Sequence, residues 1–364
     1  MNISKVVITG GPCAGKTSAL AWIQNHFTRM GWRVLFVPET ATELIKGGVA
    51  PWTCGSNLDY QKCQVWLQME KEKVFETAAK SMNDDKILIV CDRGLMDNKA
   101  YMTEEEFDVC CESIGCSYVE ARDHYDAVFH LVTAANGAPE FYSSENNAAR
   151  YETVAEAVEL DNRLISAWTG HPHLRVIDNS TDFENKLKRL INEMIAFLGE
   201  PEPIEYERKF LIEKPDTAWL EANPYCRRLD ITQVYLKTID ETERRIRRRG
   251  EKGRYMYYQT VKRSITSAKR VEVERRITQR QYNELLTLAD PECNPVTKKR
   301  YCLMHDKQYF EIDIYPFWED CAILEIESSG ENVEIRFPEN IHVIKEVTDD
   351  ASYKTHSLAK INWK

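Results

Sequence analysis

The stretch GGPCAGKTS, residues 10–18, contains residue types that bind phosphate groups. It includes the pattern G-x-x-x-x-G-K-[ST], follows an apolar segment and precedes a helical one. Glycines let backbone N–H groups surround phosphate oxygens, the lysine can bridge the β- and γ-phosphates, and the threonine hydroxyl can bind Mg²⁺. Thr17 is therefore also a predicted metal ligand. The predicted nucleotide-binding residues are Gly10, Gly11, Pro12, Cys13, Ala14, Gly15, Lys16, Thr17 and Ser18.

Acidic and basic side chains end the apolar segments that would lie beside this loop. Asp92 and Arg93 end ILIVCDR, and Glu39 ends VLFVPE. Ligands bind at the carboxyl ends of parallel strands. Asp92 is therefore predicted to hold magnesium or act as a base, Arg93 to contact phosphate, and Glu39 to bind substrate or an acceptor hydroxyl. Capping of the following helix or turn is the alternative for both acids.

Two further arginines, Arg150 and Arg163, belong to a polar stretch that runs into an amphipathic helix at 146–164. Arginines of a lid can close on a transferred phosphate, so both are substrate candidates. The alternative is pairing with neighbouring acids such as Glu152 and Glu159.

From residue 204 onward, short segments alternate charged with apolar residues. In a strand this period of two places every second side chain on the same face. In IEYERKFLI, residues 204–212, one face carries Glu205, Glu207 and Lys209. The same pattern recurs in RIRRR, QTVKR, VEVER, FEIDIY and ILEIE.

Two arrangements would bury the apolar faces of these segments. The charged faces either lie in water above a helix-covered sheet, or line the lumen of a closed barrel. The segments carry both basic and acidic residues, sorted by strand, and this mixture favours the lumen. Basic side chains neutralise phosphate oxygens, and acid pairs are ligands for Mg²⁺ or Mn²⁺.

Two different sets of elements must position these residues. Up to about residue 198, short apolar segments alternate with helical ones, which predicts an α/β domain with a parallel sheet covered by helices on both faces. The stretch LGEPEPIE contains one glycine and two prolines and predicts a linker. We expect a P-loop domain at 1–198, a linker at 199–204, and at 205–364 an α+β domain built on an antiparallel sheet or barrel.

Composition narrows the class of protein. A net charge of −10 over 364 residues argues against a protein that coats nucleic acid. We expect no transmembrane segment and no signal peptide. The 11 cysteines show no paired zinc-type spacing, which predicts reduced thiols and a cytoplasmic protein.

The first half resembles nucleotide-kinase-like P-loop domains, including the NadR-type kinases. The resemblance rests on GGPCAGKTS, on the acid after the second strand, and on the DRG sequence after the third. No N-K-x-D base-recognition sequence is present, so both ATP and GTP stay open as ligands.

The second half resembles the CYTH superfamily of triphosphate tunnel metalloenzymes. EYERK matches the E-x-E-x-K signature, and the later charged segments follow in the family's order. The resemblance implies an eight-stranded tunnel that hydrolyses triphosphates with a divalent metal. It implies that Lys209 orients the attacking water. It implies metal ligands at Glu205, Glu207, Asp313, Glu325 and Glu327, and phosphate contacts at Lys209, Arg245, Arg247, Lys262, Arg300 and Lys354.

The combination of both halves resembles the family of TRPL translocation defect protein 14 and its bacterial relatives. One hypothesis is a P-loop NTP site joined to a metal-dependent triphosphatase of tripolyphosphate or nucleoside triphosphate. A second is a small-molecule or nucleotide kinase with an accessory tunnel. A third is a nucleotide-regulated module that binds polyphosphate, or by family resemblance a phosphoinositide headgroup, without turnover.

Overall fold

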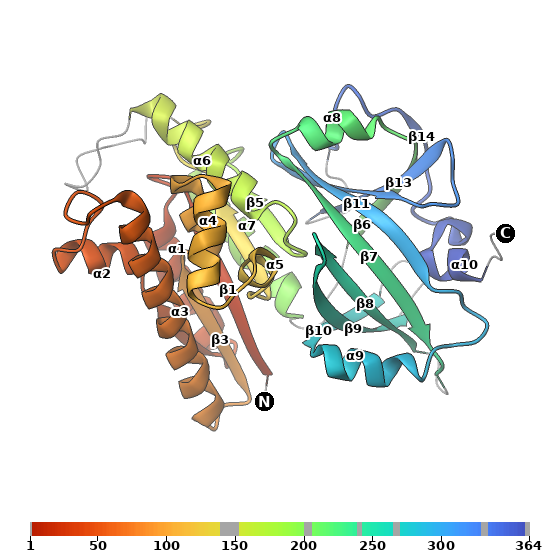
Figure 1. The fold of residues 1–364 in the computed structure, drawn as a ribbon, viewed down its shortest axis with the longest axis horizontal. Coiled ribbons are helices and arrows are strands. Elements are labelled where there is room, and N and C mark those ends of the chain that lie inside the picture. The colour runs from red at the N-terminus through yellow and green to blue at the C-terminus, as the bar shows by residue number, and fades with distance from the viewer. Residues whose placement is uncertain are drawn as a thin grey trace. The chain divides into compact units, whose positions relative to one another are not determined.

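The computed structural model describes residues 2–138, 153–199, 206–238, 242–264, 270–328 and 334–360. The chain divides into two units, Met1–Glu193 and Met194–Lys364, each with its own sheet (Figure 1). The division falls inside the helix α7 (Phe183–Leu198). Most of the expected linker, residues 199–204, lies outside the described residues, so its bounds stay a prediction.

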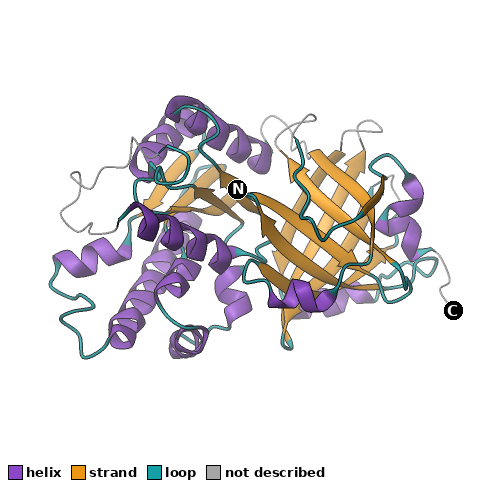
Figure 2. Cartoon of the chain, turned by 90° about the horizontal axis from the view of Figure 1, so that it is seen from above, coloured by secondary structure: helices purple, strands orange, loops and turns teal. Residues whose placement is uncertain are grey.

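The first unit is built on a five-stranded parallel sheet in the order β2-β3-β1-β4-β5. Its centre, including Val6, Val7 and Ile8, is completely buried, because helices cover the sheet (Figure 2). The predicted α/β class is confirmed. The strands are β1 (Asn2–Gly10), β2 (Arg33–Val37), β3 (Lys86–Asp92), β4 (Ala127–Leu131) and β5 (Leu174–Ile177).

Four helices of this unit, α3 to α6, begin at side chains that accept hydrogen bonds from their first turns. Ser56, Thr103, Ser117 and Thr153 each accept a bond from a backbone N–H three residues later, which satisfies a donor that the helix leaves open. The helices are α1 (Lys16–Arg29), α2 (Thr40–Lys46), α3 (Asn57–Ser81), the 3₁₀ helix η1 (Leu95–Tyr101), α4 (Glu104–Ser113), α5 (Tyr118–Arg122), α6 (Val154–Trp168) and α7.

The second unit is built on a nine-stranded antiparallel sheet in the order β10-β9-β8-β7-β11-β12-β13-β6-β14. The predicted antiparallel sheet is confirmed, with one strand more than the eight expected. The strands are β6 (Tyr206–Glu213), β7 (Cys226–Leu236), β8 (Glu243–Glu251), β9 (Arg254–Ser264), β10 (Arg270–Ile277), β11 (Val296–His305), β12 (Gln308–Ile314), β13 (Cys321–Ser328) and β14 (Val343–Glu346). The helices are α8 (Thr217–Ala222), α9 (Gln279–Leu286), the 3₁₀ helix η3 (Ala351–Tyr353) and α10 (Thr355–Ala359).

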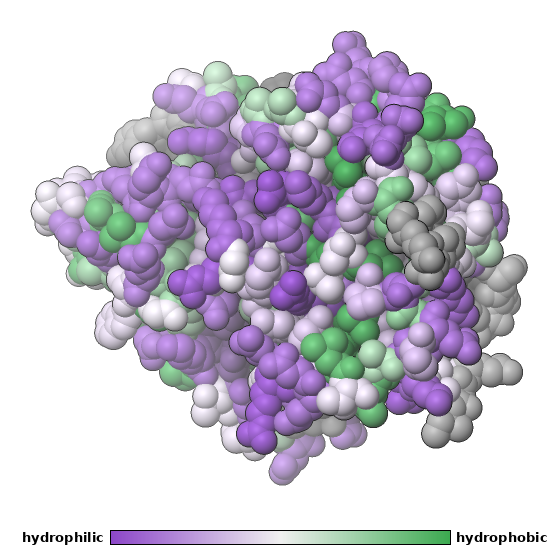
Figure 3. Space-filling model, turned by 45° about the vertical axis from the view of Figure 1, so that its right-hand side comes forward, coloured by the Kyte–Doolittle hydropathy of each residue, from purple (hydrophilic) through white to green (hydrophobic). Residues whose placement is uncertain are grey.

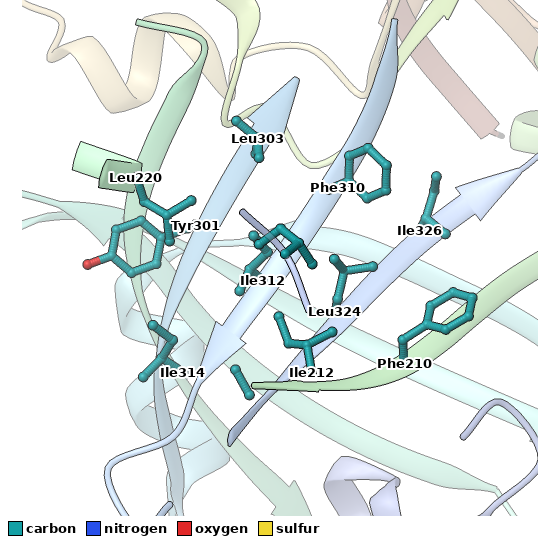
Figure 4. Packing of buried hydrophobic residues seen from close by; sticks show 12 residues of the cluster. Phe210, Ile212, Leu220, Tyr301, Leu303, Phe310, Ile312, Ile314, Leu324 and Ile326 are labelled. Carbon is teal, nitrogen blue, oxygen red and sulfur yellow. The ribbon is translucent and has the colours of Figure 1, made fainter. Parts of the chain in front are cut away.

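One face of this sheet carries an apolar cluster. Phe210, Phe310, Ile312 and Leu324 come from three adjacent strands and pack together below α8, which contributes Leu220 (Figure 4). In each strand these residues alternate with charged ones, so the charged side chains belong to the opposite face of the same sheet.

A second apolar cluster lies on that opposite face, next to the charged residues along each strand. Leu211 lies two residues beyond Lys209, Tyr315 two beyond Asp313, and Ile323 two before Glu325. Leu358 of α10 packs in the same cluster. The charged level of this face is therefore followed by an apolar level that a helix covers.

The molecular surface is largely hydrophilic on the side shown in Figure 3, with scattered hydrophobic patches. Among the described helices, none is both long and apolar enough to cross a membrane.

Candidate functional site

The loop between β1 and α1 has a backbone that only particular residues can form. Gly10 has φ 148° and Gly15 has φ 90°, and Cys13 adopts φ 56° without being a glycine. A Cβ on Gly10 would lie 2.1 Å from the carbonyl oxygen of Leu131. The loop therefore turns tightly against β4 and leads directly into α1 at Lys16, with Thr17 and Ser18 exposed in the first turn.

Three buried side chains hold this loop from behind. Asp161 of α6 accepts a 2.7 Å hydrogen bond from the Gly11 N–H, and the Thr133 hydroxyl donates to the carbonyl of Pro12. Lys186 of α7 donates to the carbonyl oxygens of Ala14 (3.2 Å) and Val132 (2.6 Å). The loop's shape is thus fixed by residues that contact it in space but lie more than 120 positions later in the sequence.

Lys16 and Asp92 lie together at the end of β3. Because β1 and β3 are adjacent parallel strands with Ile8 opposite Asp92, the loop and the acid reach the same edge of the sheet. Burial and the nearby Arg93 lower the pKa of Lys16 to about 8, although Asp92 and Glu39 oppose this. Burial raises the pKa of Asp92, against the effect of Lys16. Among the described residues, nothing hydrogen-bonds to Oδ1 of Asp92.

Arg93 is held by two acids. Its Nε donates to Glu39 Oε1 at 2.6 Å, and its Nη1 lies 3.8 Å from Asp97 Oδ1. Burial would raise the pKa of Glu39, but Arg93 and Lys16 outweigh it and lower that pKa to about 2. Arg93 itself has φ 72°. This left-handed backbone conformation is unfavourable for residues other than glycine, so surrounding contacts must hold it in place.

A cavity of about 270 Å³ opens beside these groups. Helices α2 and α3, the 3₁₀ helix η1 and the turns after β2 and β3 form its wall. The residues most relevant to chemistry are Glu39, Tyr60, Gln61, Asp92, Arg93 and Asp97.

In the second unit, a dense group of opposite charges lies on the face opposite the Phe210 cluster. We call it the charged face, made of Glu207, Lys209, Lys298, Arg300, Glu311, Asp313, Glu325 and Glu327. Arg300 donates to Asp313 at 2.7 and 2.6 Å and to Glu325 at 2.7 Å, and also contacts Glu311. Lys209 lies 2.7 Å from Glu325, and Lys298 contacts Asp313.

These charges are removed from water. Asp313 is 0% exposed, Arg300 and Glu325 are 6% exposed, and Lys298 is 7% exposed. Burial would lower the pKa of Lys209, but Glu207 and Glu325 outweigh it and raise that pKa, so the ammonium form is strongly held. Burial, with the repulsion of Glu325 added, raises the pKa of Glu207 despite Lys209. The charged face therefore combines cations that keep their protons with a carboxylate, Glu207, whose ionised form is disfavoured.

A family model described as an AAA domain matches residues 5–186, which is half of the chain. The chain belongs to the AAA domain family. The P-loop, Asp92 and the cavity all lie within the matched AAA domain. A search of curated proteins returned no match.

Solved structures match the C-terminal region. The inorganic triphosphatase NE1496 is 26% identical, with 44% of this chain and 97% of that chain covered and a TM-score of 0.30. PH1012 from Pyrococcus horikoshii OT3 is 17% identical, with 35% and 80% covered and a TM-score of 0.27. HpAC1 from Hippeastrum, whose title reads putative adenylyl cyclase with a dominant triphosphatase activity, is 11% identical, with 34% and 80% covered and a TM-score of 0.26.

Within the AAA domain, the structure brings the loop residues 10–18 together with Glu39, Asp92 and Arg93. Arg163 differs from them in exposure. It is exposed on α6, and the other face of this helix buries Leu160, Asp161 and Leu164. Arg150 lies outside the described residues. Its role and that of Arg163 stay predictions.

In the second unit, Arg247 pairs with Glu274 at 2.6 Å and lies over the ring of Tyr258. Arg245 and Lys262 are half-buried on neighbouring strands, and Lys354 immediately precedes α10. Glu205 lies outside the described residues. Asp313, expected as a metal ligand, contacts two cations through its carboxylate.

Several residues of both sites were not expected from the sequence. Lys298 lies on the same face as Arg300, two positions earlier, and the alternation in KKRYC could have revealed it. Asp97, Asp161 and Lys186 carry no comparable signal. Their contacts to the loop and to Arg93 depend on the tertiary fold.

The carboxylates fit a divalent cation only in part. Glu207 lies opposite Glu327 in the strand register, and burial together with repulsion from Glu325 raises the pKa of Glu207. Such oxygens are ligands that Mg²⁺ or Mn²⁺ prefers. Within the described ranges, however, no three acidic, His or Cys side chains are arranged as a metal site.

Proposed function

We propose that the protein is a phosphoryl enzyme with two separate phosphate sites, an NTP site in the AAA domain and a metal-dependent triphosphatase site on the charged face. The observation that supports the second site is the burial of Lys209, Lys298 and Arg300 among acids. Removing such charges from water costs several kcal/mol per ion unless they are paired, and apolar residues would stabilise the sheet as well or better. Selection for a polyanionic ligand explains why they are kept.

In this proposal, Lys209, Lys298 and Arg300 bind the phosphate oxygens of a triphosphate. Arg300 gives the guanidinium fork that suits two oxygens at once, and Lys209 keeps its charge because its pKa is raised. As the ligand enters, these cations exchange carboxylate partners for phosphate. The acids Glu207, Glu325 and Glu327 would hold the divalent metal, which polarises the phosphoryl group when bound.

The test is phosphate release from tripolyphosphate and from NTP by the full chain in Mg²⁺ or Mn²⁺. Exchanging Glu205 and Glu207 for Gln should abolish release. Arg208→Ala is the matched control, because Arg208 lies on the other face of the same strand and pairs with the exposed Glu346. Undiminished release in the Glu205/Glu207 variant contradicts the proposal. Tight triphosphate binding without turnover would favour a binding module instead.

The cavity beside Asp92 favours a second candidate, phosphoryl transfer in the AAA domain. A hydrolase needs only a water beside the γ-phosphate, whereas a kinase needs room for an acceptor. The cavity supplies this room at the carboxyl end of β3, next to Lys16. Incorporation of label from γ-labelled ATP into an organic acceptor tests this candidate.

A further inference from the structure

The cavity of the AAA domain has a charge balance that restricts its ligand. Of the described residues that line it, Glu39, Asp92 and Asp97 are acidic and Arg93 is basic. Arg93 is already engaged, at 2.6 Å from Glu39 and 3.8 Å from Asp97. A phosphate group on the ligand would meet an excess of negative charge and would have to compete for the guanidinium.

Amide side chains form the floor of the cavity. Gln64 donates to Asn98 at 2.6 Å, and Asn98 donates to Gln68 at 3.1 Å, so these amides satisfy one another. Gln68 in turn donates to the carbonyl of Arg93 at 3.3 Å. This hydrogen-bond network holds the side chains of the cavity floor in place, where a ligand would contact them.

Gln61 is the exception in this floor. It is 3% exposed, and in the part of the chain that the structure describes, its Oε1 atom has no hydrogen-bond partner. A buried amide oxygen without a donor destabilises the protein, because it has lost its hydrogen bonds to water. Gln61 lines the cavity, so a ligand N–H or O–H that reaches this oxygen would satisfy it.

The volume limits the ligand's size. Ligand pockets commonly measure about 300–1,000 Å³, and about 270 Å³ is just below that range. A compound with one or two rings fits, and a dinucleotide does not.

We propose that this cavity binds a small hydroxyl compound that carries no phosphate or other anionic group, donates a hydrogen bond to Gln61, and accepts the γ-phosphoryl group of the NTP. This rests on the phosphoryl transfer proposed above. The acceptor oxygen forms a bond to the γ-phosphorus, and the bond from the γ-phosphorus to the β–γ bridging oxygen breaks. The NDP leaves, and the hydroxyl proton passes to the Asp92 carboxylate.

The test uses the full chain, γ-labelled ATP and matched pairs of acceptors. Each pair is an alcohol and its own phosphate ester: thymidine and thymidine 5′-monophosphate, uridine and uridine 5′-monophosphate, glucose and glucose 6-phosphate. At least one alcohol should gain label at least about tenfold faster than its ester, as expected for a site that rejects a buried unpaired charge.

Two substitutions sharpen this test. Glu39→Gln removes one acid and releases Arg93, so discrimination against the ester should fall by about tenfold. Gln61→Met keeps the size of the side chain and should raise the acceptor KM by about tenfold with the ATP KM unchanged. Gln61→Asn serves if the methionine variant does not fold, and Gln24→Met, at an exposed position of α1, is the control.

The outcomes distinguish the proposed acceptor site in the cavity from the proposed NTP site at the P-loop. Equal or faster labelling of the phosphate esters overturns the inference, as does failure of every alcohol to gain label while ATP still binds at the P-loop. If the unaltered protein does not bind ATP, the proposed NTP site itself is overturned.

Discussion

The two proposed phosphate sites are built in different ways. The P-loop relies on backbone N–H groups whose geometry is fixed by Asp161, Thr133 and Lys186 from behind. The charged face relies on side chains that, without ligand, neutralise one another. In the proposal above, the first site is shaped in advance, and the second would have to exchange ion pairs before it could bind. This difference predicts how each site fails.

The largest effect should come from separating the sites. Lys16→Ala should weaken ATP binding by roughly 100-fold, since the lysine contacts the β- and γ-phosphates, and should leave phosphate release from tripolyphosphate intact. The Glu205/Glu207 double exchange to Gln should do the reverse. ATP binding by calorimetry and phosphate release by a colour assay are measured on both variants. Loss of both functions in either variant would contradict two independent sites.

The next effect is on stability. Arg300→Met removes the cation shared by Glu311, Asp313 and Glu325 and should lower the free energy of unfolding by about 3–5 kcal/mol, because buried acids are left uncompensated. Urea unfolding measures it. Arg208→Met on the exposed side of β6 should cost at most about 0.5 kcal/mol. Similar losses of unfolding free energy in the two variants would mean that water reaches the charged face more than its burial suggests.

A moderate effect concerns pH at the P-loop. The free protein's Lys16, with a pKa of about 8, is an ammonium below pH 8 and loses its proton above it. Nucleotide binding requires the charged form, so the ATP Kd should rise by about 30-fold between pH 7 and pH 9.5. Lys16→Arg keeps its charge over this range and should bind ATP with little pH dependence. A flat profile in the unaltered protein would argue against the lowered pKa.

The smallest effect tests the support behind the loop. Asp161→Ala removes the acceptor of the Gly11 N–H and should weaken ATP binding by about fivefold, equivalent to one hydrogen bond of about 1 kcal/mol. No comparable change is expected in tripolyphosphate release. A loss as large as that of Lys16→Ala would show that Asp161 does more than hold the loop.

Local sequence pattern predicted the parts of the fold that follow a repeating rule. The parallel sheet came from continuous apolar runs such as KILIVCD, and the antiparallel sheet from alternation such as FEIDI. Strand β14 was not predicted because its sequence, VIKE, does not alternate apolar with charged residues, and all four residues are exposed at the edge of the sheet.

Site residues were predictable where a motif or an alternation contained them. Lys16 lies in a phosphate-binding pattern, and Arg300 and Glu325 lie on charged stripes. Asp161 was not predictable, because its partner Gly11 is 150 residues away and no local pattern links them. The pairing of Arg93 with Glu39 rather than with a ligand is likewise a result of tertiary contact.

The apolar level of Leu211, Tyr315 and Ile323, covered by α10, has a kinetic consequence. In the triphosphatase proposed above, a linear ligand lying along the charged face would meet this apolar level at one end, with Glu207 and Glu327 toward the other. Cleavage would then produce two fragments in a single file. The fragment nearer the apolar level would then lie deeper than the other, so the expected order of product release, with the outer fragment first, follows from the sheet rather than from the chemistry.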